Sequence, residues 1–63
     1  MSKKSMLEKM REVRAANWFI EARTPGGWVT VYHGPHMRSA MNAVQDHDDT
    51  RVTYLYGTWK ELA

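Results

Sequence analysis

The chain has 63 residues, of which 43% are hydrophobic and 25% charged, and its formal net charge is +2. A chain of this length forms one small domain with a thin core, so we expect a single domain over residues 1–63. Cysteine is absent, which excludes a disulfide-rich secreted scaffold and a zinc site built on thiolates.

The first predicted element is an amphipathic helix over residues 1–16. Ser5 and Glu8 have the spacing of a capping box, in which each side chain bonds the other's backbone N–H at a helix start. An apolar stripe with helical spacing follows at Met6, Met10 and Val13. Charged residues follow the basic start, and no apolar run approaches the roughly 20 residues of a membrane span. We therefore expect a cytoplasmic protein with neither a signal peptide nor a membrane segment.

A β-hairpin is expected next, over residues 17–23 and 28–33, because both segments are rich in aromatic and β-branched residues. The connecting residues 24–27 read Thr-Pro-Gly-Gly. Either a type II turn, with Gly26 in the position that needs a positive φ, or a four-residue loop fits them. Both options predict the same register.

That register divides the hairpin between two faces of the sheet. The predicted core face pairs Ala22 with Val29, Ile20 with Val31, and Trp18 with His33. The second face pairs Arg23 with Trp28, Glu21 with Thr30, and Phe19 with Tyr32. This aromatic second face needs a cover, which is the first helix, a second copy of the chain, or a partner.

A second helix and a third strand complete the predicted domain. Gly34-Pro35 opens the helix, since proline is tolerated in a first helical turn, and the helix ends within residues 46–49. Its core-facing stripe is Met37, Ala40, Met41 and Val44. The third strand covers residues 50–56 and ends at Gly57, after which Thr58 and Glu61 repeat the capping-box spacing. We therefore expect a short helical turn within residues 58–63.

The predicted fold is a small α+β domain of order α-β-β-α-β, with the hairpin, helix and strand over residues 17–57. A right-handed crossover makes the strand at 50–56 pair antiparallel with the strand at 17–23. The result is a three-stranded, mainly antiparallel sheet with strand order 2-1-3 and a helix packed on one face.

No residue pattern predicts catalysis, because the serines and threonines lack a neighbouring base and no glycine-rich phosphate loop is present. His33 and His36 are three residues apart on a predicted turn, and two ligands at this spacing could hold zinc together with an aspartate, although the spacing alone is weak evidence. No third ligand is fixed nearby, and His47 reads as solvated. We predict no enzyme activity, no bound metal and no cofactor.

Three aspartates cluster at the predicted C-terminus of the second helix, at positions 46, 48 and 49. The helix macrodipole disfavours negative charge there, so local stability does not account for them. One interpretation is a solvated loop built from turn-forming residues. The other is an acidic patch that meets a basic surface on a partner.

Protein recognition is the leading functional hypothesis. Five methionines provide adaptable apolar surface, and three tryptophans and three tyrosines are residue types enriched at interfaces. We expect Trp28, Trp59 and one tyrosine to be exposed. The predicted protein-binding residues are Phe19, Trp28, Tyr32, Asp46, Asp48, Asp49 and Trp59.

Nucleic-acid binding is the alternative, because basic helices follow phosphates and exposed aromatic rings on a sheet stack bases. It would use the aromatic sheet face and the following basic residues: Lys3, Lys4, Lys9, Arg11, Arg14 and Arg23. The acidic run at 46–49 opposes this hypothesis, because it repels a polyanion.

From Asn17 to Tyr56 the order of elements resembles, in outline, the small single-domain proteins with which bacteriophages bind and disable host enzymes. The resemblance rests on size, element order and the acidic run, and it transfers no site residues. It implies an inhibitor or modulator of a host macromolecule, of the phage or mobile-element type. We predict a small non-catalytic protein that acts through protein–protein interaction. A homodimer that hides part of the aromatic face is one arrangement in which it would act.

Overall fold

The computed structural model describes residues 3–62, which form two helices and a four-stranded antiparallel sheet. The elements are α1 (Lys3–Glu12), β1 (Asn17–Thr24), β2 (Gly27–Gly34), α2 (Met37–Asp46), β3 (Thr50–Tyr56) and β4 (Thr58–Glu61). The predicted α+β class is confirmed, but the sheet has four strands and not three. Residues 1, 2 and 63 of the predicted domain, and the side chain of Lys3, lie outside what the structure describes.

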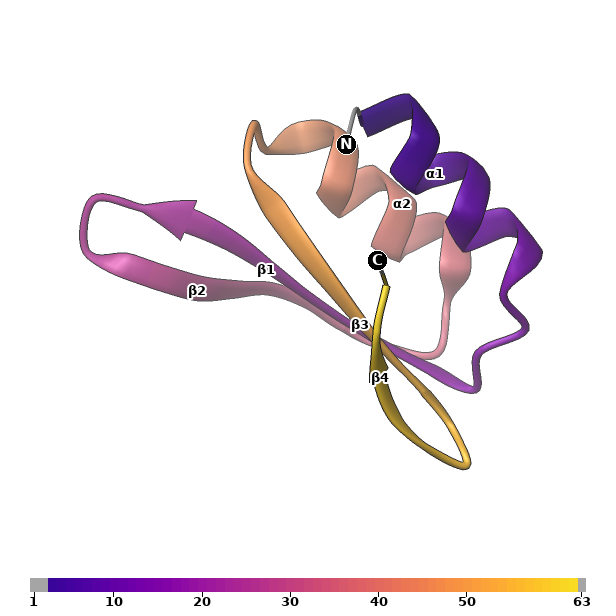
Figure 1. Ribbon diagram of the computed structural model, residues 1–63. Helices are drawn as coiled ribbons and strands as arrows, with labels where there is room; N and C mark the ends of the chain where they lie inside the picture. The colour runs from indigo at the N-terminus through magenta and orange to yellow at the C-terminus, as the bar shows by residue number, and fades with distance from the viewer. Residues whose placement is uncertain (1–2, 63) are drawn as a thin grey trace.

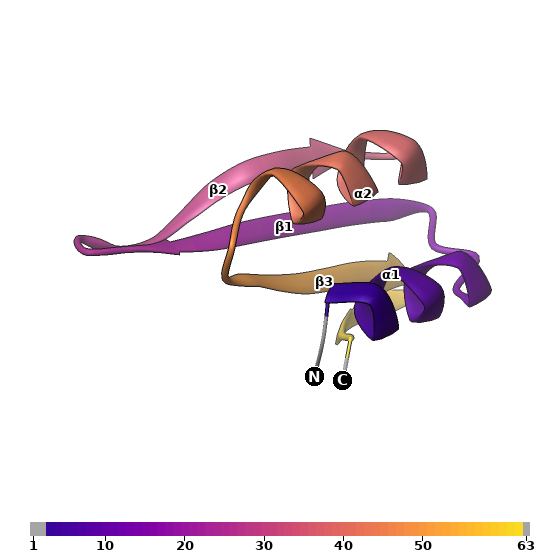
Figure 2. The same cartoon turned by 90° about the horizontal axis from the view of Figure 1, so that it is seen from above.

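The sheet has the strand order β2-β1-β3-β4, which confirms the predicted order of the first three strands. The two helices run side by side in opposite directions on one face of the sheet (Figure 1). Seen from above, the β1–β2 hairpin extends beyond the helices (Figure 2). The opposite face carries no helix from the described part of the chain, and we call it the open face.

The core lies between the helices and the sheet. On β1 alternate residues point into it, so that Trp18, Ile20 and Ala22 are buried while their neighbours are not. The predicted stripe of the second helix contributes Ala40 and Val44, both fully buried. The remaining buried residues are Met10 from α1 and Val52 from β3.

The first helix is shorter than predicted and ends at Glu12. The Val13 N–H still donates to the Met10 carbonyl at 3.2 Å, but the Ala16 N–H donates to the Leu55 carbonyl of β3 at 2.9 Å. The chain therefore leaves the helix early to reach the sheet. Ser5 lies inside the helix, so the predicted capping box is wrong.

The hairpin turn differs from the type II alternative. A positive φ, of +118°, falls on Gly27, whereas a type II turn needs it on Gly26. The Thr24 hydroxyl accepts the Gly26 N–H at 3.2 Å and donates to the Gly27 carbonyl at 2.8 Å. This side chain ties the turn together.

The predicted terminal helical turn is wrong, because residues 58–61 form β4 at the edge of the sheet. Gly57 has a φ of +83°, which reverses the chain so that Tyr56 pairs with Thr58 and Leu55 with Trp59. The Leu62 N–H donates to the Val52 carbonyl at 2.9 Å, which extends the contact beyond β4. Long-range pairing therefore outweighs the local helix signal in this segment.

Replacing Gly57 by alanine is expected to lower the free energy of unfolding by about 1–2 kcal/mol, the cost of a left-handed backbone for a residue with a Cβ. An added Cβ meets nothing within 4 Å, so the effect comes from the backbone alone. Urea denaturation measures it, with Gly26→Ala as the control because no positive φ is found there. Equal losses in the two variants would contradict this explanation.

Candidate functional site

A β-bulge in β2 decides which hairpin side chains reach the open face. The three pairs nearest the turn are as predicted: Arg23 with Trp28, Ala22 with Val29, and Glu21 with Thr30. The register then shifts between Ile20 and Glu21, so Val31 has no partner on β1. Beyond the shift the predicted pairs are wrong, and Ile20 pairs with Tyr32, Phe19 with His33, and Trp18 with Gly34.

Compared with the predicted register, the shift places Tyr32 on the core face and His33 on the open face. Tyr32 packs against the core, and its hydroxyl accepts the His36 N–H at 3.0 Å. The prediction of Tyr32 as a residue of the aromatic binding face is therefore wrong. His33, expected beside Trp18, lies instead against Phe19 on the open face.

Three aromatic side chains gather on the open face, and we call Phe19, His33 and Trp59 the aromatic cluster. The ring centroids of Phe19 and His33 are 5.5 Å apart with an interplanar angle of 89°, an edge-to-face contact. Those of Phe19 and Trp59 are 6.3 Å apart, and those of His33 and Trp59 are 6.0 Å apart. Because the rings are inclined to one another, they do not close into a flat stack.

The cluster and Thr53 line a shallow apolar hollow of about 380 Å³. Each strand of the sheet supplies one of these side chains: Phe19 from β1, His33 from β2, Thr53 from β3 and Trp59 from β4. The hollow therefore exists only when β4 is added to the sheet. Sequence reasoning missed Thr53, because its position in the register is what brings it beside Phe19.

A second aromatic feature on the open face is Trp28, near the hairpin turn. The Arg51 guanidinium carbon lies 4.4 Å from the centroid of a Trp28 ring, and the Arg51 Nε donates to Glu21 Oε1 at 2.7 Å. The side chains of Arg51 and Glu21 are 44% and 16% exposed, so this ion pair contributes only about 0–1 kcal/mol. The contacts hold the Trp28 ring in place, and sequence reasoning missed Arg51.

The basic residues of α1 do not lie on the same surface as the aromatic cluster. Lys4, Lys9 and Arg11 belong to α1, which packs on the opposite face of the sheet (Figure 1). Arg14 is exposed between α1 and β1, and Arg23 is exposed on β1. The sheet therefore separates the two parts of the predicted nucleic-acid surface.

The acidic run lies away from the aromatic cluster. Asp46 ends α2, and Asp48 and Asp49 are exposed in the connection to β3. The Asp49 carbonyl accepts the Arg23 N–H at 2.9 Å, which places this connection beside the turn end of β1. Phe19 precedes Arg23 by four residues on β1, a distance of about 13 Å at the usual rise of a strand. The acidic run and the aromatic cluster therefore lie apart, whereas Trp28, which pairs with Arg23, is at the same end of β1 as the acidic run.

The three histidines occupy different places in the fold. His33 joins the aromatic cluster, while His36 and His47 flank α2 as its N-cap and C-cap residues. Within residues 3–62, no group of three or more side chains from His, Asp and Glu has the arrangement of a metal site. In the same part of the chain, no helix is long and apolar enough to cross a membrane.

The open face is suited to apolar contact and to hydrogen bonding from its rim. The His33 side chain makes no hydrogen bond to another described residue, so its ring nitrogens can bond to a ligand. Comparison of the chain with family models, with curated proteins and with solved structures found no match.

Proposed function

We propose that this chain is a non-catalytic binding protein that recognises another protein through its open face. The observation that supports this proposal is the aromatic cluster on a sheet face that neither helix covers. Tryptophan is among the residue types most often found at interface hot spots, and Trp28 and Trp59 are 37% and 47% exposed. An aromatic centre surrounded by a polar rim is the usual anatomy of a protein interface.

The charges on the open face favour a protein over a nucleic acid as the partner. Arg23 and Arg51 share this face with Glu21 and Glu61, so the positive and negative side chains balance. Nucleic-acid affinity depends on cationic side chains that replace counterions along the phosphates. The basic residues of α1 lie behind the sheet and do not add to this face.

Nucleic-acid binding remains the second candidate, because aromatic rings on an antiparallel sheet are a known platform for stacking bases. The exposed ring of Trp59 supports this candidate, because a base stacks on an accessible ring face. Phosphate contacts would then have to come from Arg23 and Arg51, the second of which already bonds to Glu21.

Trp59→Ala is expected to weaken partner binding by about 30-fold or more, which corresponds to the 2 kcal/mol of an interface hot spot. The full chain, carrying a tag, is first used to capture partners from nuclease-treated lysate. The captured protein is then purified and its dissociation constant measured for each variant. Tyr56→Ala is the matched control. Tyr56 is an aromatic residue that is 66% exposed, but it lies two residues after Tyr54 on β3 and therefore on the same side of the sheet as Tyr54, away from the open face.

The proposal would be overturned if Trp59→Ala left the dissociation constant unchanged while its circular-dichroism spectrum showed the fold to be unaltered. Loss of all captured material on nuclease treatment would support the nucleic-acid alternative, as would a steep loss of affinity between about 50 and 200 mM salt. The narrower hypothesis of an inhibitor of a host macromolecule stays a prediction, which the identity of the captured partner tests.

A further inference from the structure

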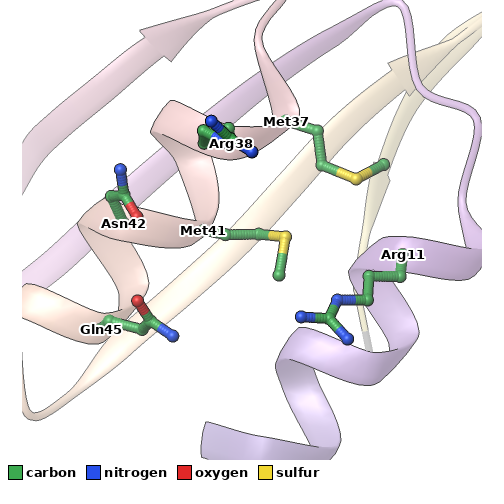
Figure 3. A pocket seen from close by; sticks show the side chains of 6 residues that line it. All are labelled: Arg11, Met37, Arg38, Met41, Asn42 and Gln45. Carbon is green, nitrogen blue, oxygen red and sulfur yellow. The ribbon is translucent and has the colours of Figure 1, made fainter.

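One outward stripe of α2 carries charges in a self-complementary order. Arg38, Asn42 and Asp46 are four residues apart, so they lie on the same side of the helix, and all three are exposed. Arg38 and Asp46 are separated by about 12 Å along the axis, at 1.5 Å per residue. The neighbouring stripe, Met37, Met41 and Gln45, projects toward Arg11 on α1 (Figure 3).

Neither end of this stripe is compensated within the described chain. Among residues 3–62, no ion pair is formed by Arg38 or by Asp46. The first turn of α2 contains no acidic residue and its last turn no basic residue. Each charge therefore sits at the end of its own helix where the macrodipole disfavours it, at a cost of about 0.3–1 kcal/mol.

We propose that two copies of this chain associate through α2, packed antiparallel about a two-fold axis at Asn42. Antiparallel packing centred on residue 42 places Arg38 opposite Asp46 of the partner subunit, and Asp46 opposite Arg38 of the partner subunit. The two Asn42 amides then face each other, and each can donate to the other's oxygen. This isologous arrangement uses the same patch on both subunits, as closed dimers do.

The arrangement also reverses the unfavourable helix-end electrostatics. Next to an antiparallel neighbour, Arg38 lies at the C-terminal end of the other helix, and Asp46 lies at its N-terminal end. Both charges are then at the helix end that favours them. The carboxylates of Asp46 and Asp48, which form no ion pair within residues 3–62, acquire basic partners in the dimer.

The groove beside α2 extends the same patch. It has a volume of about 420 Å³, and it is lined by Arg11, Met37, Arg38, Met41, Asn42 and Gln45. Arg11 adds a second positive charge near Arg38, while Asp48 adds a second negative charge beyond Asp46. Flexible methionine side chains adapt to a packed neighbour, so they supply the apolar part of the contact.

This dimer differs from one that hides the aromatic face, because α2 and the open face lie on opposite sides of the sheet. Two open faces would point outward, away from the dimer interface. A partner with repeated epitopes would then be held by both copies, which raises avidity without any new contact.

Sedimentation equilibrium of the full chain tests the dimer. A contact along one ten-residue helix lies at the small end of interface sizes, so concentrations from about 10 µM to about 1 mM are needed. We expect the weight-average mass to rise from the monomer value of 7.4 kDa toward twice that value. A monomer mass over the whole range would overturn the proposal.

Charge reversal tests the interface itself. Arg11→Glu/Arg38→Glu makes the basic end acidic, and Asp46→Lys/Asp48→Lys makes the acidic end basic. Each variant alone is expected to stay monomeric because like charges then face each other, whereas an equimolar mixture of the two should form a heterodimer. Lys60→Glu, an exposed change on β4, is the single-charge control and should leave the dimer intact.

Circular dichroism establishes that each variant is folded before its mass is measured. Failure of the mixture of two folded variants to associate would overturn the proposal. The proposal would also be overturned if the wild type formed a dimer and Trp59→Ala abolished it, since that result would place the contact on the open face. Monomeric charge variants should still bind a captured partner with a single open face, so a failure of the dimer and a failure of the proposed function give different results.

Discussion

Replacing Trp18 by alanine is expected to leave most of the chain unfolded at 25 °C. Trp18 is fully buried and is the largest side chain in the core, where its ring lies 6.0 Å from that of Tyr54. Tryptophan-to-alanine changes in a core cost about 3–5 kcal/mol through lost burial and the cavity left behind. Domains of this size have about 3–9 kcal/mol of total stability, so the loss removes much or all of it.

Thermal unfolding followed by near-ultraviolet circular dichroism measures this effect. Trp28→Ala is the matched control, since it removes the same side chain from a site that is 37% exposed. We expect that variant to lose about 1 kcal/mol or less, because its contact with Arg51 is at the surface. A Trp18→Ala protein as stable as the control would show that the core is not where the structure places it.

Gly34→Ala is expected to cost about 1–3 kcal/mol, although Gly34 does not have a positive φ. A Cβ at this position would lie 2.5 Å from the Tyr32 hydroxyl oxygen and 3.0 Å from the ring carbon that bears it. The Tyr32 ring must therefore move, and the hydrogen bond from the His36 N–H is lost with it. That bond holds the residue from which α2 starts.

A double-mutant cycle in urea separates this clash from other effects. Tyr32→Phe removes the oxygen that the new Cβ would meet, so adding Gly34→Ala to it should cost less than adding Gly34→Ala to the wild type. Strict additivity of the two changes would contradict the explanation.

Periodicity predicted the elements whose apolar residues face a single core. In α2, Ala40 and Val44 occur at the spacing of a buried helical stripe, and both are buried. On β1 the core face carries Trp18, Ile20 and Ala22, whereas the other face carries the charged residues Glu21 and Arg23, and this difference predicted which face is buried. In these elements the local pattern and the tertiary environment agree, which is why the sequence was sufficient.

The bulge was not predictable from alternation, because its position depends on a contact outside the strand. Val31 and Tyr32 both pack against the core, whereas a regular ladder would place only one of the two on that side. The Tyr32 hydroxyl reaches His36, which helps place Tyr32 on the core side and leaves Val31 as the extra residue. The sequence therefore indicated an aromatic open face correctly but assigned Tyr32 to it in place of His33.

In the fourth strand, a local helix signal conflicts with contacts that form only in the folded sheet. Thr58 and Glu61 carry a local helix-start signal, whereas Trp59 gains contact with Phe19 and His33 only in a strand. These ring contacts, together with the strand pairing, outweigh a cap worth about 1 kcal/mol. Trp59 was thus predicted as a binding residue, while the strand that positions it was not.

The bulge at Val31 reverses the alternation of side chains between the two faces of the hairpin. Residues 28–30 alternate in one phase and residues 32–34 in the other, so the point of phase change determines which ring faces outward. Displacing that point toward Gly34 would return Tyr32 to the open face and withdraw His33 from it. The same sequence thus encodes two surfaces of different chemistry, and the hydrogen bond between the Tyr32 hydroxyl and the His36 N–H favours one of them.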